Sequence, residues 1–156
     1  MTEFALESHF MHSLEAAEIL LVDDSAEDAE LTLRTLRKGK VNNPIYPVRD
    51  GVEALQFIFG EGPYSNRRGR LPSLIMLDLK MPQIGGIEVL QRLKADPYTA
   101  SIPVIVLTAS AAHRDIIQSY NLGVNSYLIK PVSLAAFAEV ISQVGLSWTI
   151  TNAAPV

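Results

Sequence analysis

The sequence has no cysteine, a small share of charged residues and no long run of apolar residues, and each absence narrows the possible functions. Zero cysteines among 156 residues exclude a disulfide framework and thiol chemistry, although they exclude no cellular compartment. No stretch approaches the roughly 20 apolar residues that a membrane-spanning helix requires, so we expect no membrane span. Charged residues make up 19% of the chain, slightly below the usual share.

The chain also lacks an excess of basic charge and an export signal. Its formal net charge of −4 gives no electrostatic argument for binding nucleic acid. Residues 1–17 have neither the basic region nor the apolar region of an export signal. We therefore expect a cytoplasmic protein without a nucleic-acid or membrane partner, whose length fits one domain with a sizeable core.

Short apolar runs alternate with amphipathic stretches after residue 18. The runs at 19–22 and 74–77 are branched and uninterrupted, which is typical of parallel strands buried on both faces. The expected strands are residues 18–23, 45–49, 74–78, 103–107 and 126–129, and the helices that follow them are 25–39, 50–58, 85–96, 113–121 and 133–145. Five units of this kind predict an α/β fold, a doubly wound parallel five-stranded sheet with right-handed crossovers.

Two other segments have more than one interpretation. The segment 60–72 contains Arg67, Arg68 and Arg70, and a solvated loop is favoured over a surface for an acidic partner. Apolar residues alternate with small or polar ones from Val144 to Ile150, and this period of two predicts an extended segment. Its apolar face could cover the chain's own domain or form an arm against a second subunit.

Three carboxylates close two of the apolar runs. Asp23 and Asp24 follow the first run, and Asp78 follows the third. Ligands of open α/β sheets bind at the carboxyl ends of the strands, so neighbouring strands would bring these acids into one cleft. Their mutual repulsion then requires a cation or a shared proton. Oxygen ligands without cysteine or histidine favour Mg²⁺ over a transition metal.

Two further strand ends carry Thr108 and Lys130. A carboxylate can attack phosphorus and form an aspartyl phosphate, while a metal ion neutralises the phosphoryl oxygens. A lysine ammonium supplies a second positive charge, and a threonine hydroxyl can donate to a phosphoryl oxygen. Together, the strand ends predict a site that accepts a phosphoryl group.

Simpler interpretations exist for each residue alone. Asp24 could be a helix cap, Thr108 a turn residue and Lys130 a solvated charge, but their joint occurrence favours a site. A phosphatase of the haloacid dehalogenase kind would need a second acid two residues after the nucleophile, where Lys80 stands. A flavodoxin-like nucleotide or flavin module would need a glycine-rich phosphate loop after the first strand, and none follows.

Four motifs resemble the receiver domain of two-component response regulators. They are ILLVDD at 19–24, LDLKMP at 77–82, VLTA at 106–109 and YLIKP at 127–131. The resemblance implies a flavodoxin-like (βα)₅ fold with strand order 2-1-3-4-5 over residues 18–145. Residues 1–17 and 146–156 would then be an N-terminal and a C-terminal extension.

The resemblance also implies a role for each site residue. Asp78 would be the phosphoacceptor, and Mg²⁺, or Mn²⁺ or Ca²⁺ in its place, would be held by Asp23, Asp24, Asp78 and the backbone carbonyl of Lys80. Thr108 would be the switch hydroxyl, Lys130 the ammonium that contacts the phosphate, and Tyr127 the aromatic rotamer switch. Such a protein is a phosphoacceptor for signalling, with self-catalysed phosphoryl transfer and dephosphorylation, and no enzyme in the usual sense.

A narrower similarity is to the small stand-alone regulators of bacterial phytochromes. It lies in RDGVEAL at 49–55, the long loop before the third strand, LKADP at 93–97, VNSY at 124–127 and the tail with Trp148. It implies that the partner is a bacterial phytochrome. It also implies a homodimer through the helix at 113–121, the strand at 126–129, the last helix and the C-terminal extension. The broader resemblance to receiver domains implies a sensor histidine kinase as partner and a cis Lys130–Pro131 bond. With no output domain predicted in these residues, the output would be protein–protein contact.

Overall fold

The structure is a computed structural model that describes residues 17–81, 83–109 and 114–144. The predicted C-terminal extension and nearly all of the N-terminal one lie outside these residues. The expected extended segment after Val144 lies outside them as well.

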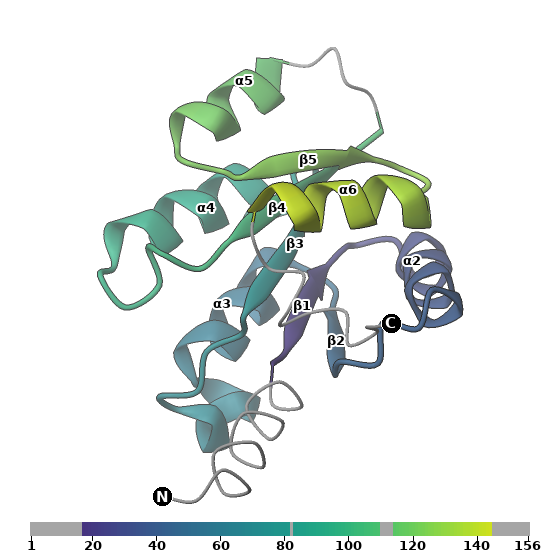
Figure 1. The fold of residues 1–156 in the computed structure, drawn as a ribbon. Coiled ribbons are helices and arrows are strands. Elements are labelled where there is room, and N and C mark those ends of the chain that lie inside the picture. The colour runs from purple at the N-terminus through teal and green to yellow at the C-terminus, as the bar shows by residue number, and fades with distance from the viewer. Residues whose placement is uncertain (1–16, 82, 110–113, 145–156) are drawn as a thin grey trace, which may run out of the picture.

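The strands form one five-stranded sheet in which every neighbouring pair is parallel (Figure 1). They are β1 (Ile19–Val22), β2 (Ile45–Val48), β3 (Leu74–Asp78), β4 (Val104–Thr108) and β5 (Ser126–Ile129). Their order, β2-β1-β3-β4-β5, confirms the predicted α/β fold and topology. Glu18 and Asp23 lie just outside the two ends of β1, so a buried strand of four apolar residues carries an acid at each end.

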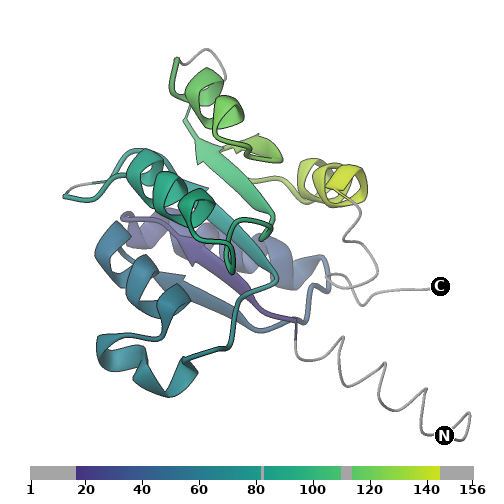
Figure 2. The same ribbon diagram turned by 90° about the vertical axis from the view of Figure 1, so that its left-hand side faces the viewer.

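Helices cover both faces of the sheet (Figures 1 and 2). They are α2 (Ala26–Lys38), α3 (Gly51–Phe59), α4 (Gly86–Ala95), α5 (Arg114–Asn121) and α6 (Leu134–Val144). Helices α2 and α6 lie on one face, and α3, α4 and α5 lie on the other. Within the described ranges, no helix combines the length and apolar character needed to cross a membrane.

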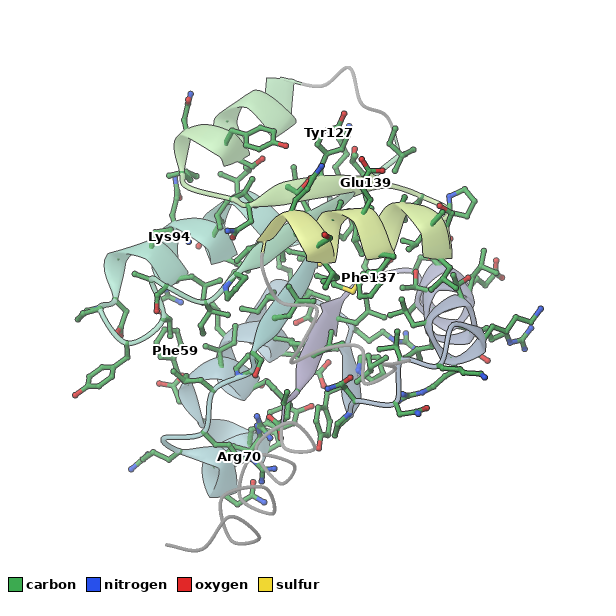
Figure 3. The ribbon with its side chains drawn as sticks, in the orientation of Figure 1. Phe59, Arg70, Lys94, Tyr127, Phe137 and Glu139 are labelled. Atoms are coloured by element: carbon green, nitrogen blue, oxygen red, sulfur yellow. The ribbon has the colours of Figure 1, made fainter. Side chains whose placement is uncertain are left out.

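Two apolar cores lie on opposite faces of the sheet, because the side chains of a strand alternate between its faces. Leu20, Val22 and Leu77 pack with α3 and α4 on one face. Leu21 packs with α2 and α6 on the other, where Phe137 fills the space between α6 and the sheet (Figure 3). Burying each such side chain contributes about 1.5–3 kcal/mol, so the sheet is a rigid support for the residues at its ends.

The first turns of α2 and α3 lie directly after strand ends and are fixed by side-chain caps. Ser25 Oγ accepts a hydrogen bond of 3.1 Å from the backbone N–H of Asp28, and Asp50 Oδ1 accepts one of 2.8 Å from Glu53. These bonds satisfy N–H groups that have no partner inside the helix. Each cap therefore sets the position of a helix start at the carboxyl edge of the sheet.

Gly86 lets the start of α4 approach the end of β3 closely. A Cβ atom at this position would lie 2.5 Å from the carbonyl oxygen of Asp78 and 2.6 Å from the Cα of Leu79. Atoms do not approach one another this closely, so a larger residue would have to displace one of the two segments. The close contact holds the backbone of Asp78 against α4.

The prediction of a solvated loop at 60–72 is wrong at Arg67. This segment contains the short 3₁₀ helix η1 (Gly62–Arg67), and Arg67 is buried. Its guanidinium donates to the carboxylate of Glu18 and stacks 3.8 Å from the ring centroid of Phe57. Arg70 adds a 2.8 Å ion pair to the same carboxylate and remains exposed (Figure 3). Glu18 is 2% exposed, and a buried charge requires partners of this kind.

Candidate functional site

A pocket of about 240 Å³ opens at the carboxyl edge of the sheet. Its lining residues are Asp24, Ser25, Asp28, Asp78, Leu79, Lys80, Leu107, Thr108, Ala109 and Lys130. They come from the ends of β1, β3, β4 and β5 and from the first turn of α2. Five residues singled out from the sequence therefore meet in one pocket, as the topology of a parallel sheet requires.

The three predicted acids come together although Asp78 is far from the other two in the sequence. Asp23, Asp24 and Asp78 each offer a carboxylate oxygen, and these oxygens lie within 4.8 Å of one another. The pairing of Val22 with Leu77 in the sheet places Asp23 beside Asp78. Asp23 is fully buried, Asp78 is 6% exposed, and Asp24 is exposed.

Backbone N–H groups orient two of these carboxylates. The N–H of Ser25 donates to Asp23 Oδ1 at 3.0 Å, and the N–H of Lys80 donates to Asp78 Oδ1 at 3.1 Å. Each bond joins a carboxylate at the end of a strand to the backbone N–H two residues later. The turns therefore fix the acids in place before any ligand binds.

Lys130 lies at the centre of the cluster. Its Nζ atom is 3.0 Å from Asp23 Oδ2, 3.1 Å from Asp28 Oδ2 and 3.1 Å from Asp78 Oδ2. Burial alone would lower the pKa of this ammonium, but the three carboxylates outweigh that effect and raise it. The interpretation of Lys130 as a solvated charge is therefore wrong. The bond from Lys130 to Pro131 is cis, as the resemblance implies.

Asp28 was not among the predicted site residues. In the sequence it lies within the helix expected at residues 25–39. Its position in the first turn of α2 could have indicated more, because that helix begins at the carboxyl edge of the sheet, directly after Asp23 and Asp24. The pairing of Asp28 with Lys130 joins residues 102 positions apart, and no local pattern contains it.

The pKa of Asp78 is raised from 3.8 to about 6. Burial of the carboxylate is the main cause, and the neighbouring charge of Asp23 adds to it. The positive charge of Lys130 and the hydrogen bond from the Lys80 N–H act in the opposite direction. One lysine thus neutralises the cluster only in part, and a further cation would favour the ionised form of Asp78.

The three acids fit a hard divalent cation. They present carboxylate oxygens within reach of one common point, and the chain has no thiol to attract a softer metal. Lys80, whose backbone carbonyl is the further predicted ligand, lines the same pocket. The residues present therefore suit Mg²⁺ and similar ions.

The two predicted switch residues lie on adjacent strands. Thr108 ends β4, is 9% exposed and lines the pocket. Tyr127 lies on β5 next to Val106, two residues before the level of Thr108. Its ring makes an edge contact with Tyr120 of α5 at a centroid distance of 6.4 Å, in the space between β5 and α5 (Figure 3). Thr108 therefore lies on the strand next to the one whose Tyr127 contacts α5.

Comparison with known proteins gives one family for almost the whole described chain. The family model for the response regulator receiver domain matches residues 19–142. The chain is 37% identical to the response regulator Rcp1 of Synechocystis sp. over 137 residues, which are 88% of this chain and 92% of that protein.

Solved structures give the same result. The bacteriophytochrome response regulator AtBRR has a TM-score of 0.81 and 42% identity, covering 89% of this chain and 99% of its own. The phosphorylated cyanobacterial phytochrome response regulator RcpA has a TM-score of 0.71 and 35% identity, with coverages of 89% and 97%. The Mn²⁺-bound form of Rcp1 has a TM-score of 0.69 and 36% identity, with coverages of 90% and 99%.

Proposed function

Because this chain belongs to the response regulator receiver family, we propose that Asp78 accepts a phosphoryl group from a sensor histidine kinase in a Mg²⁺-dependent step. The observation that carries the proposal is the placement of Asp78. Its carboxylate lines an open pocket beside two other acids and the ammonium of Lys130. The chain is a two-component signalling protein similar to phytochrome response regulators.

In this proposal Asp23, Asp24, Asp78 and the backbone carbonyl of Lys80 hold the metal ion. Mg²⁺ is the expected occupant, and Mn²⁺ or Ca²⁺ could replace it. When bound, the ion neutralises the charge on the phosphoryl oxygens during in-line transfer. The Mn²⁺-bound form of Rcp1, a relative of this chain, supports a divalent cation as the occupant.

The side chains of the chain supply the remaining steps. A carboxylate oxygen of Asp78 attacks phosphorus, the P–O bond forms, and the P–N bond of the donor phosphohistidine breaks as its imidazole leaves. The Lys130 ammonium attracts the phosphoryl oxygens, and the Thr108 hydroxyl donates a hydrogen bond to one of them. The added charge of about −1.5 to −2 is then sensed by Thr108 and Tyr127 and transmitted to α5.

We further propose a bacterial phytochrome as the kinase and a homodimer as the signalling form. The first point is supported by two similar proteins, the bacteriophytochrome response regulator AtBRR and the cyanobacterial phytochrome response regulator RcpA. The dimer would form through the face of α5, β5 and α6, where Tyr120 is 44% and Ile129 is 46% exposed, together with residues 146–156. Residues 1–17, 18–145 and 146–156 would be an extension, the receiver domain and a second extension of this cytoplasmic protein.

Acetyl phosphate with Mg²⁺ tests the phosphoacceptor directly. The intact mass of the protein should rise by one phosphoryl group, and EDTA or the substitution Asp78→Asn should prevent the increase. Asp50→Asn is the matched control, because asparagine caps a helix as well as aspartate and Asp50 is bonded to the start of α3. Labelling of the Asp78→Asn variant would contradict the proposal.

The same preparation separates the two alternative functions. A phosphatase of the haloacid dehalogenase kind would turn over phosphate esters, and we expect no turnover. A flavin module would show flavin absorbance after purification, and we expect none.

A further inference from the structure

Asp28 contacts Lys130 but belongs to none of the roles proposed above. Its Oδ2 atom lies 3.1 Å from the lysine Nζ, the same distance as that of Asp78. The compact set of oxygens that could hold a metal contains Asp23, Asp24 and Asp78 and does not include Asp28. Its side chain is 46% exposed, whereas those of Asp23 and Asp78 are almost fully buried.

The ammonium of Lys130 has three N–H donors, and in this structure three carboxylates accept from it. Two of these acceptors have another partner during the proposed reaction. Asp23 binds the metal ion, and Asp78 becomes bonded to the phosphoryl group. Asp28 is the remaining acceptor, and its position at the start of α2 does not depend on either ligand.

We propose that Asp28 is a positioning residue that holds the Lys130 ammonium beside the phosphoryl group while Asp23 and Asp78 are engaged elsewhere. This inference rests on the proposed function. Asp28 lies between two adjoining pockets. The site pocket and a second pocket along α2 are both lined by Asp28, Ala109 and Lys130. Without Asp28, the flexible lysine side chain would be free to turn toward the second pocket.

A simple effect of charge predicts the opposite sign, which makes the proposal testable. Removing one negative charge near the pocket should by itself attract anionic phosphodonors and speed labelling. Removing a positioning contact should slow it, because the ammonium spends less time beside the phosphoryl group. The two explanations therefore differ in direction.

The experiment compares Asp28→Ala with Glu27→Ala. Glu27 is the adjacent acid in the same first turn of α2, is exposed, and offers the same change in charge. With acetyl phosphate and Mg²⁺, we expect labelling of Asp28→Ala to be roughly five- to tenfold slower, as for a partly exposed charge-assisted hydrogen bond. Glu27→Ala should change the rate less than twofold. Equal rates for the two variants, or faster labelling of Asp28→Ala, would overturn the proposal.

A double-mutant cycle shows whether Asp28 acts through the lysine. In a Lys130→Met background, Asp28→Ala should change the labelling rate less than twofold. A persistent slowing in that background would assign the effect to another cause and overturn the proposal.

A metal-free measurement keeps the cycle informative if labelling becomes too slow. In EDTA, Asp28→Ala should lower Tm more than Glu27→Ala does. In the Lys130→Met background the two substitutions should have similar effects, because each then removes one acid from the first turn of α2. The same loss in both backgrounds would contradict the pairing. If the unmodified protein takes up no phosphoryl group, the proposed function fails; if it does and Asp28→Ala matches its control, this inference alone fails.

Discussion

The two ends of β1 carry acids with opposite environments. At the amino end, Glu18 is 2% exposed and is paired with Arg67 and Arg70. At the carboxyl end, Asp23 is fully buried and shares the single ammonium of Lys130 with two other carboxylates. Glu18 therefore has two cationic partners, whereas Asp23 shares one cation with two other carboxylates.

This difference separates a structural ion pair from the proposed phosphorylation site. The cluster around Glu18 is closed by stacking of a guanidinium on Phe57 and leaves no excess negative charge. The cluster around Asp23 opens into a pocket, and there burial, together with the neighbouring charge of Asp23, raises the pKa of Asp78 to about 6. Incomplete neutralisation is destabilising by itself, and it suits the metal ion and the phosphoryl group of the proposed function.

Breaking the amino-end cluster should give the largest loss of stability. Arg67→Ala leaves Glu18 buried with only the exposed Arg70, and we expect the free energy of unfolding to fall by about 3–5 kcal/mol. Urea unfolding measures this change. Arg70→Ala is the control, since its pair with Glu18 is exposed on one side and should contribute about 1 kcal/mol or less. Similar losses in the two variants would contradict the structural role assigned to Arg67.

The carboxyl end should respond in the opposite direction. In EDTA at pH 7.5, Asp78→Asn should raise the free energy of unfolding by about 1–2 kcal/mol, after allowance for screening of the charge by water and Lys130. Thermal unfolding of the two proteins checks the sign. A lower Tm for the asparagine variant would show that the unmodified cluster is already well neutralised.

The pH dependence of that gain follows from the pKa of Asp78. The folded-state value of about 6 is above the ordinary 3.8, so the folded protein binds this proton more tightly. Its contribution to stability is complete below pH 3.8 and is lost as the pH rises through 6. The difference in Tm between Asp78→Asn and the unmodified protein should therefore widen from about pH 4 to about pH 7. A constant difference over this range would contradict the raised pKa.

Addition of Mg²⁺ should give a smaller effect that is confined to the carboxyl end. At ten times its dissociation constant, a ligand that binds only the folded protein stabilises it by about 1.4 kcal/mol. Asp24→Asn should remove most of this shift, whereas Arg70→Ala should keep all of it. Calorimetry with and without Mg²⁺ measures both. An undiminished shift in Asp24→Asn would exclude Asp24 as a ligand.

The sequence predicted the sheet because short apolar runs alternate with helical patterns. It predicted the meeting of Asp23, Asp24, Asp78 and Lys130 because parallel strands end at one edge. It did not predict the partners of buried charges. Asp28 lay within an expected helix and Arg67 in an expected solvated loop, yet both make ion pairs with residues far away in the chain.

A local sequence pattern indicates which face of a helix or strand is buried and where the element ends. It does not indicate which of Arg67, Arg68 and Arg70 is buried, because that depends on the fold, which brings residue 67 beside residue 18. The sequence did contain one indication of each of these two ion pairs. Glu18 directly precedes a buried strand, and so it needed a cation. Asp28 lies in the first turn of a helix that begins at the site, and so it was within reach of it.

The central claim is that the partly neutralised end of β1 supports chemistry at one carboxylate. Reduction with borohydride converts an aspartyl phosphate into homoserine, and peptide mass spectrometry then identifies the residue. After treatment with acetyl phosphate and Mg²⁺, we expect homoserine at position 78 alone. Homoserine at position 23, 24 or 28, with Asp78 unchanged, would contradict it.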